Sequence, residues 1–499
     1  MLLLPSQNRQ LPSEPARRSL LAFMAAMLVV LTCRAGSGLP PDIQQSLHRQ
    51  GFSPDQIGVV VMSPRDGRIR MDHFGHRARS PASTLKLLTT LSALESLGPD
   101  FVWTTQLQST GTLEQGVLHG SVYLHGGAEP DFSWVKLGLM LRQLRDQGVH
   151  DIDGDLVVDR SYFSPSRLDL YQPPFDSTPA QYYNVIPDAM LVNSNSIELH
   201  LDSTGNQIAI GFLPPLEGVR IRSELVLNGD NCSDWDEEWP APDQLVDGNQ
   251  LTIVLQGTFP LHCVNGTSSN ILDRNQFIER LVRGLWHELG GQWHGQVRDG
   301  VTPSDASVLV EHKSAALADI IKIINKNSDN TMARNLFLTL GAQSVQRGSQ
   351  IDSIATLDAA QKQVRHWLLQ HRIDDAGLVL ENGSGLSRLE RISPIQLANI
   401  LKAGTDSPWQ PEFVSSLPIM GMDGTMAKRN AKDITPGGAR IKGGTLNNTV
   451  AVAGYVQDIM GETWIVVAMI NRPDAGAGRA VLDDLIAWIA GHPEKSGHK

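Results

Sequence analysis

Three short polar motifs in this chain contain residue types that could transfer an acyl group. They are Ser83-Thr84-Leu85-Lys86, Ser328-Asp329-Asn330 and Lys442-Gly443-Gly444-Thr445. A serine three residues before a lysine on a helix places both side chains on one face, where a neutral amine could take the hydroxyl proton. The second motif offers a polar clamp, and the third offers a glycine-rich strand edge that a substrate backbone can approach closely. Together they predict catalysis through a serine ester.

Each motif is weak evidence when it is taken alone. A chain of this length contains about two Ser-x-x-Lys sequences by chance, and Ser133–Lys136 and Ser496–Lys499 are two further examples. Ser133 precedes an apolar helix, where a helix cap explains it fully, and Ser496 lies in a polar tail. The occurrence of all three motifs in this order is therefore what favours catalysis at Ser83.

Length and composition bound the class of protein. The 499 residues exceed a single core and suggest two or three domains. Contents of 41% hydrophobic and 19% charged residues are ordinary for a folded, soluble protein, and the net charge of -11 offers no basic stripe for nucleic acid. The pair His73/His76 lacks a third ligand, and His287/His294 lacks the spacing of a zinc helix. We expect no metal, no organic cofactor and no nucleic-acid partner.

The first 35 residues predict an export signal. Arginines precede an apolar run, Leu20 to Leu31, which is too short to span a bilayer comfortably, and small polar residues follow it. The stretch Arg17-Arg18-Ser19-Leu20-Leu21 also loosely resembles a twin-arginine signal. A lipidated Cys33 and an uncleaved anchor are the alternatives. We expect residues 1–35 to be a signal peptide.

Only two cysteines follow this segment, Cys232 and Cys263. In an exported protein, two cysteines in one region most simply form a disulfide. Two unpaired, buried thiols are the alternative.

The pattern of elements predicts one sheet formed by both ends of the chain. A strand at Ile57–Met62 opens a hairpin near the N-terminus, and strands at Thr449–Val456 and Trp464–Ile470 lie near the C-terminus, followed by a closing apolar helix. Ser83 falls at the first turn of a largely buried helix, and Ser328-Asp329-Asn330 falls between two apolar helices. The intervening residues, about 100–301, change to short strands, turns and acidic loops. They therefore predict an insertion of roughly 200 residues.

With the three motifs in this order, the chain resembles the D-alanyl-D-alanine carboxypeptidase/endopeptidase family, the class C low-molecular-mass penicillin-binding proteins of peptidase family S13. The likeness includes the long insertion after Ser83 and further stretches that are usual in that family: Pro81-Ala82-Ser83-Thr84, Gly154–Asp159, Ala189–Asn193 and Asn382–Arg388. It implies an α/β (α+β) fold, with a penicillin-binding transpeptidase or β-lactamase-like domain whose antiparallel sheet is flanked by helices. Two nested, β-rich domains would be inserted into it.

The resemblance also implies domain boundaries. Residues 39–98 and 303–491 would form the catalytic domain, 99–160 and 271–302 the inserted domain II, 161–270 the inserted domain III with both cysteines, and 492–499 a disordered tail.

Catalytic roles are carried over from the family to the matching positions. The resemblance implies that Ser83 is the nucleophile and Lys86 its general base. Ser328 and Asn330 would relay protons and hold the peptide. The N–H groups of Ser83 and Thr445 would form an oxyanion hole.

Substrate-binding roles fall on the third motif and its surroundings. Lys442 would bind the terminal carboxylate of the substrate, with Gly444 and Thr445 at the strand edge and Arg388 beside the site. The chain departs from the family pattern at Gly443, where a threonine or serine is usual. Losing that hydroxyl removes a hydrogen bond to the carboxylate, which is worth about 1.5–3 kcal/mol. An internal cross-link is therefore expected to suit the site better than a free terminus.

The function implied is a serine D,D-peptidase of peptidoglycan, acting on D-Ala-D-Ala termini, on D-Ala-diaminopimelate cross-links, or on both. Stem peptides and β-lactams would be its ligands, in the periplasm of a Gram-negative-type cell, with at most peripheral membrane contact and with a homodimer left open. One alternative is a serine β-lactamase or related esterase, which the long insertion disfavours. The other is a catalytically weakened wall-binding protein, which Gly443 keeps plausible.

Overall fold

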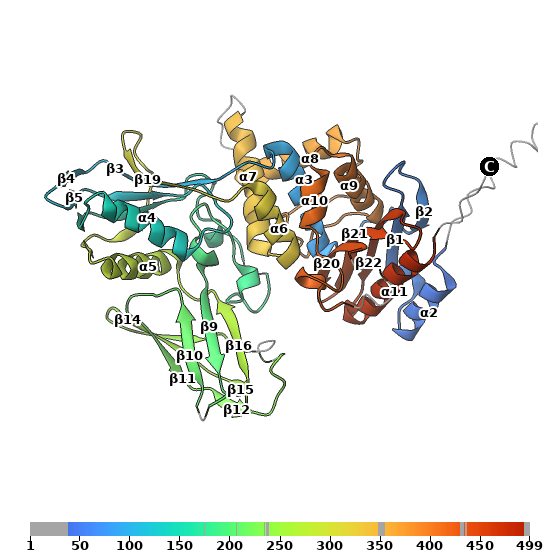
Figure 1. Cartoon of the computed structure of the whole chain (residues 1–499), viewed down its shortest axis with the longest axis horizontal. Coiled ribbons are helices and arrows are strands. Elements are labelled where there is room, and N and C mark those ends of the chain that lie inside the picture. Colours follow the sequence, from blue (N-terminus) through green and yellow to red (C-terminus); the bar gives the residue numbers. More distant parts are fainter. Residues whose placement is uncertain are drawn as a thin grey trace, which may run out of the picture.

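The computed structural model describes residues 38–493, apart from positions 174, 206, 234, 236–238, 348–354, 430–433 and 435–436. The predicted signal peptide, and residues 494–499 of the predicted tail, lie outside the described residues. Within the described part of the chain, no helix has both the length and the apolar character that a membrane span requires. Figure 1 shows the helix-covered sheet that contains β20, β21 and β22 at one end of the molecule and the inserted sheets at the other.

The central sheet is built from both ends of the chain, as the sequence predicts. Its five strands follow the order β2-β1-β22-β21-β20, and all neighbours are antiparallel. The strands are β1 (Ile57–Met62), β2 (Ile69–His73), β20 (Ala439–Leu446), β21 (Thr449–Gln457) and β22 (Thr463–Asn471). The N-terminal strand β1 therefore pairs directly with β22, with Ile57 opposite Ile470.

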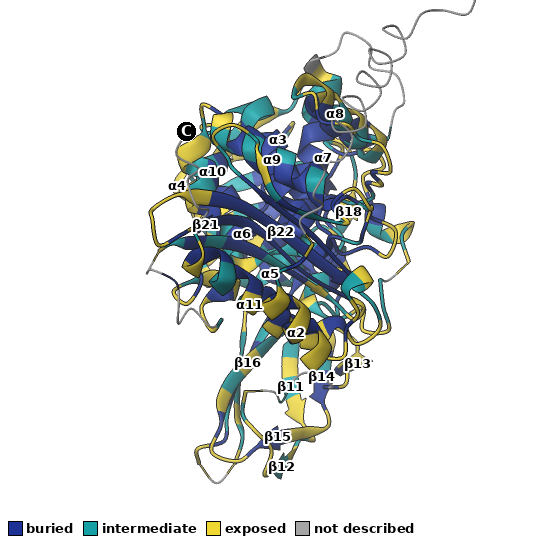
Figure 2. Cartoon of the chain, turned by 90° about the vertical axis from the view of Figure 1, so that its right-hand side faces the viewer, coloured by how far each residue is buried: buried dark blue, intermediate teal, exposed yellow. Residues whose placement is uncertain are grey.

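Helices cover both faces of this sheet. Because side chains alternate across a strand, Val450 and Val452 of β21 face one core, and Ala451 and Ala453 face the other. The first core contains α2 (Pro41–Arg49) and α11 (Gly478–Gly491). The second contains residues from α3 (Lys86–Leu97), α6 (Leu317–Asn327), α7 (Asn330–Arg347), α8 (Thr356–Gln370), α9 (Pro394–Asp406) and α10 (Gln410–Ser416). Figure 2 shows β21 and β22 as buried strands between these layers.

The segment between α3 and α6 forms further sheets around a core of its own. A five-stranded sheet has the order β18-β8-β6-β3-β19, from Val297–Asp299, Leu156–Asp159, Val122–His125, Thr104–Ser109 and Ser307–Lys313. A four-stranded sheet has the order β17-β7-β5-β4, from Gln292–Trp293, Asp151–Asp153, Val117–His119 and Thr112–Glu114. Two helices belong to this region, α4 (Trp134–Asp146) and α5 (Arg274–Glu288).

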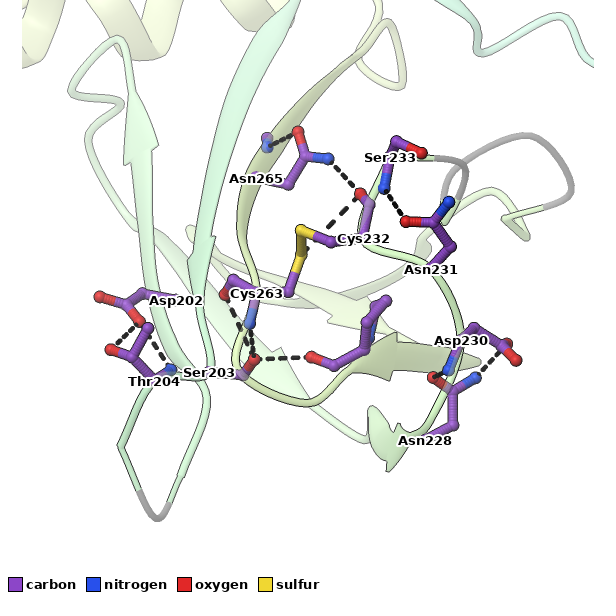
Figure 3. Close-up of a disulfide and its surroundings, with 12 residues drawn as sticks. Asp202, Ser203, Thr204, Asn228, Asp230, Asn231, Cys232, Ser233, Cys263 and Asn265 are labelled. Atoms are coloured by element: carbon purple, nitrogen blue, oxygen red, sulfur yellow. Dashed lines mark hydrogen bonds between the residues drawn. A yellow bond between two sulfur atoms is a disulfide. The ribbon is translucent and has the colours of Figure 1, made fainter.

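Three smaller sheets complete the insertion. They are β10-β9-β16 (Ala209–Leu213, Ile197–Asp202, Val264–Ser269), β11-β14-β13 (Val219–Ser223, Gln250–Leu255, Asp243–Asp247) and β12-β15 (Val226–Asn228, Thr258–Pro260). Cys232, which follows β12, forms a disulfide with Cys263, which precedes β16 (Figure 3). The disulfide expected from the sequence is thus formed. The predicted domain boundaries stay a prediction.

Candidate active site

Ser83 lies on a tight turn that is held between two glycine-containing segments. The 3-10 helix η2 (Ala82–Leu85) runs directly into α3, and Ala82 has a positive φ of 45°. A Cβ atom at Gly385 would lie 1.8 Å from the carbonyl oxygen of Ala82, and one at Gly444 would lie 2.9 Å from the Ser83 nitrogen. Backbone atoms cannot yield to such contacts. Both positions therefore require glycine if these segments are to pack against the turn that holds Ser83.

The Lys86 side chain lies next to Ser83 and forms three hydrogen bonds. Its Nζ lies 3.0 Å from Ser83 Oγ, 2.6 Å from Asn330 Oδ1 and 2.6 Å from the carbonyl oxygen of Ser384. The side chain is fully buried. Burial lowers the pKa of Lys86 to about 7, although the nearby carboxyl groups of Asp329 and Glu390 oppose this shift.

These contacts orient the Lys86 amine as a base. A neutral amine has two N–H groups and one lone pair, and the carbonyl oxygens of Asn330 and Ser384 only accept hydrogen bonds. When both N–H groups donate to these oxygens, the lone pair is left for the hydroxyl group of Ser83. The geometry therefore suits transfer of the Ser83 proton to Lys86.

The second motif forms the joint between α6 and α7, as the sequence predicts. Ser328 ends α6 in the left-handed conformation, with φ at 60°. Asp329 Oδ1 accepts the backbone N–H of Met332 at 2.8 Å, in the first turn of α7. Asn330 begins α7, and its Nδ2 donates to the carbonyl oxygen of Tyr183 at 3.3 Å. A residue of the insertion thus contacts a residue of the site.

Lys442 connects strand β20 to the second motif. Its Nζ lies 2.8 Å from Ser328 Oγ and 2.7 Å from the carbonyl oxygen of Gly443. The side chain is fully buried, and burial lowers its pKa well below the ordinary value, with the charge of Lys86 acting in the same direction. The hydroxyl group of Ser328 therefore lies beside a second buried amine.

Strand β20 is an edge strand of the central sheet, and its outer edge faces this site. The backbone N–H of Ile441 donates to Pro418 O at 2.8 Å, on the side away from β21. Because N–H directions alternate along an antiparallel strand, Gly443 and Thr445 direct their N–H groups to the same outer side. Gly444 lies against Ser83, so the N–H groups of Thr445 and Ser83 occur at one edge, as an oxyanion hole requires.

The structure thus brings most of the predicted site residues together. Hydrogen bonds join Ser83, Lys86 and Asn330 in one group, and Lys442 and Ser328 in the other. Gly444 and Thr445 lie beside them on β20. Arg388 is the exception, because no hydrogen bond between described residues joins it to this group.

Arg388 instead contacts an aromatic ring. Its side chain is exposed, and its guanidinium group lies 5.4 Å from the centroid of the Phe175 ring. The decoy motif at Ser133 is a helix cap, as expected, because Ser133 Oγ accepts the N–H of Lys136 at 3.4 Å. Among the described residues, no group of three or more His, Cys, Asp or Glu side chains is arranged to hold a metal ion.

Sequence reasoning missed three contributors to the site: the carbonyl oxygens of Ser384 and Tyr183, and the buried carboxyl group of Glu390. The stretch Asn382–Arg388 was the signal for the first, because it resembles a family motif. A backbone carbonyl leaves no trace in residue type, so that signal did not say which atom would contact Lys86.

The fold and the paired amine and hydroxyl groups define a serine acyl-transfer protein of the penicillin-recognising type. Residues 40–491 match the D-Ala-D-Ala carboxypeptidase 3 (S13) family, and the chain belongs to that family.

Two related proteins and one crystal structure agree with this assignment. The chain is 25% identical over 426 residues to the D-alanyl-D-alanine carboxypeptidase DacB of Haemophilus influenzae. The matched region covers 84% of this chain and 86% of that protein. It is 27% identical over 480 residues to a D-alanyl-D-alanine carboxypeptidase of an Actinomadura species, covering 92% and 86%. The crystal structure of penicillin binding protein 4 from Haemophilus influenzae has the same fold, with a TM-score of 0.71, 22% identity, and coverage of 90% of this chain and 99% of that one.

Proposed function

We propose that the protein is a serine D,D-peptidase that hydrolyses peptidoglycan stem peptides through an acyl-enzyme on Ser83. The observation that carries this proposal is the fully buried Lys86 amine, 3.0 Å from Ser83 Oγ and with a pKa lowered to about 7. The family assignment supports the same activity, since the two curated relatives are D-alanyl-D-alanine carboxypeptidases.

The first half of the cycle forms the ester. Neutral Lys86 takes the proton of Ser83, and Ser83 Oγ attacks the carbonyl carbon of the D-Ala residue that precedes the scissile bond. The oxyanion is held by the N–H groups of Ser83 and Thr445. Ser328, which accepts a hydrogen bond from Lys442 at 2.8 Å, relays the proton that Lys86 took to the leaving amine, so that the scissile C–N bond breaks and Lys86 is neutral again.

The second half of the cycle releases the acyl group. Neutral Lys86 takes a proton from the water that attacks the ester, and it returns that proton to Ser83 Oγ as the ester C–O bond breaks, which regenerates Ser83. During formation of the ester, Asn330 holds the substrate backbone, and Lys442 and Thr445 bind the terminal carboxylate of the residue that leaves. These steps use only side chains and backbone groups of the chain, with no metal or organic cofactor.

Labelling with a fluorescent penicillin tests the proposal. β-Lactams present a strained amide and a carboxylate to the same groups, so the wild-type protein should be labelled and the Ser83→Ala variant should not. Absence of label on the wild-type protein would exclude the enzyme hypothesis and would favour the hypothesis of a wall-binding protein. Labelling followed by fast release of hydrolysed penicillin would favour the β-lactamase alternative.

Muropeptides then distinguish the two D,D-peptidase reactions. Monomeric pentapeptide muropeptides report carboxypeptidase activity, and dimers cross-linked through D-Ala-diaminopimelate report endopeptidase activity. Because Gly443 lacks the usual hydroxyl group, we expect the cross-linked substrate to be preferred.

Location and assembly follow from the same proposal. The substrate lies in the cell wall, so the mature protein would act in the periplasm, with at most peripheral contact with a membrane. Cell fractionation tests the location, and light scattering of the purified protein tests whether it forms a homodimer.

A further inference from the structure

One loop outside the three motifs holds Lys86 from a separate part of the chain. This loop, residues 381–386, lies between α8 and α9, and its Ser384 carbonyl oxygen accepts a hydrogen bond from Lys86 Nζ at 2.6 Å. The next carbonyl upstream, that of Gly383, accepts a hydrogen bond from Thr89 Oγ1 at 2.6 Å. Both contacts reach α3, the helix of Lys86. The position of this loop therefore decides how the Lys86 amine is oriented.

Glu390 anchors that loop through hydrogen bonds to its backbone. Its side chain is fully buried, and its Oε1 accepts three consecutive backbone N–H groups, those of Glu381 (3.2 Å), Asn382 (2.9 Å) and Gly383 (3.0 Å). Successive N–H groups that converge on one oxygen form a site for an anion. Its second oxygen, Oε2, has no hydrogen-bond partner among the described residues. A buried carboxyl group with one unsatisfied oxygen lowers stability, which points to a role other than stability.

Three charged groups among the described residues act on the Lys86 amine. Asp329, between α6 and α7, and Glu390 favour its charged form, while buried Lys442 on β20 carries a like charge when it is protonated. Burial raises the pKa of Glu390, and Glu381 in the anchored loop acts in the same direction, while the three N–H groups oppose this shift. Arg334 on α7 is attracted to both carboxyl groups. Glu390 is therefore one of two carboxyl groups that act against burial at Lys86.

We propose that Glu390 is a positioning residue for acylation of Ser83: its carboxyl group holds the N–H groups of residues 381–383 and so fixes the Ser384 carbonyl against Lys86 Nζ, and its charge acts on the amine that this carbonyl holds. This inference rests on the proposed function. It adds a residue outside the three motifs to the control of the reaction.

The test is the pH profile of the acylation rate with a fluorescent penicillin. The variants Glu390→Gln and Glu390→Met both remove the charge, so Lys86 should lose its proton more readily and the acidic limb should move to lower pH by about one unit. The maximal rate of Glu390→Gln should stay within about threefold of wild type, because an acceptor oxygen remains. That of Glu390→Met should fall about tenfold or more, because three N–H groups lose their acceptor.

Two further variants control for a merely structural role. Glu390→Asp keeps the charge, so its acidic limb should stay with that of wild type even if its maximal rate falls. Glu381→Gln changes a carboxyl group of the same loop that accepts a hydrogen bond from Ser387 Oγ, and its limb should not move.

The results separate this inference from the function on which it rests. If wild type is labelled and the limb of every charge-removing variant that folds coincides with that of wild type, the role of Glu390 is overturned. If wild type is not labelled at any pH, the proposed function itself fails. Thermal unfolding of each variant shows which of them fold.

Discussion

At the scale of single residues, the proposed role of Lys86 as the base makes the reaction of Ser83 depend on the protonation of Lys86. Burial holds the pKa of Lys86 at about 7, and only the neutral amine can accept a proton. The acylation rate should therefore rise with pH up to about 7, fall about tenfold per unit below that, and level off above it. Stopped-flow measurement with a penicillin across pH 5–9 checks this. A rate that does not depend on pH in this range would contradict Lys86 as the base.

The substitution Lys86→Arg tests the same residue by chemistry. A guanidinium group cannot lose its proton in a protein, so we expect acylation to fall about 10²–10⁴-fold. The chain offers a matched control in Lys136, which also follows a serine by three residues but whose Nζ lies 2.7 Å from Glu129 Oε1. Lys136→Arg should leave labelling unchanged. Equal loss in both variants would indicate damage to the fold.

Gly443 is the residue at which substrate preference should be adjustable. Among the described residues, a Cβ atom there would meet Met426 Sδ alone, at 3.5 Å, which is ordinary van der Waals contact. The substitution Gly443→Thr should thus be accommodated and should supply the missing hydroxyl group. A hydrogen bond worth about 1.5–3 kcal/mol corresponds to a gain of about 10–100-fold in kcat/KM on monomeric pentapeptide muropeptides. An equal gain in Gly443→Ala, which lacks the hydroxyl, would refute this explanation.

Residue types indicated the side chains of the three motifs that the structure brings together, but not the carbonyl oxygens of Ser384 and Tyr183 or the carboxyl group of Glu390. Ser83 and Lys86 could be paired from their spacing alone, because three residues on a helix bring side chains together. Ser384 could not, because it contributes a carbonyl oxygen that any residue type provides. Glu390 lies four residues from the loop that it anchors, and nothing local in the sequence indicates that contact.

At the scale of elements, the packing of β20 against η2 makes the outer edge of this strand a candidate substrate edge. A Cβ atom at Gly444 would lie 2.8 Å from the carbonyl oxygen of Pro81 and 2.9 Å from the Ser83 nitrogen. Gly444→Ala should therefore push β20 away from Ser83 and lower the acylation rate about 100-fold. Gly443→Ala adds the same methyl group one residue earlier, where there is space, and should acylate normally. Normal acylation by Gly444→Ala would show that the close approach is not needed.

The bounds of individual strands could be predicted, whereas their order in the sheet could not. The apolar run Ile57–Met62 indicated β1 with the bounds that the structure has, while β21 is one residue longer than expected at its C-terminal end and β22 is one residue longer at each end. Their neighbours depend on contacts between residues some 400 positions apart, such as Ile57 with Ile470. Only the general rule that terminal strands share a sheet was available from the sequence.

At the scale of the whole molecule, the insertion has a hydrophobic core of its own. The cores on the two faces of the central sheet consist mainly of residues from the two ends of the chain. The core of the insertion consists of residues between Leu107 and Val310. Tyr183 shows that the two parts nevertheless meet at the site, because its carbonyl oxygen accepts from Asn330. A disturbance confined to the far part of the insertion should therefore spare the chemistry at Ser83.

Removal of the disulfide would disturb the insertion in this way. Cys232 and Cys263 are 31 residues apart, and closing a loop of this length restricts the unfolded chain by about 3–4 kcal/mol. The double variant Cys232→Ala/Cys263→Ala should lower the melting temperature of the insertion, while the acylation rate at Ser83 stays within about twofold of wild type. Calorimetry should then resolve a low-temperature transition that penicillin does not shift and a second that penicillin raises. A single transition, or acylation lost together with the disulfide, would mean that the insertion and the catalytic sheet unfold as one cooperative unit.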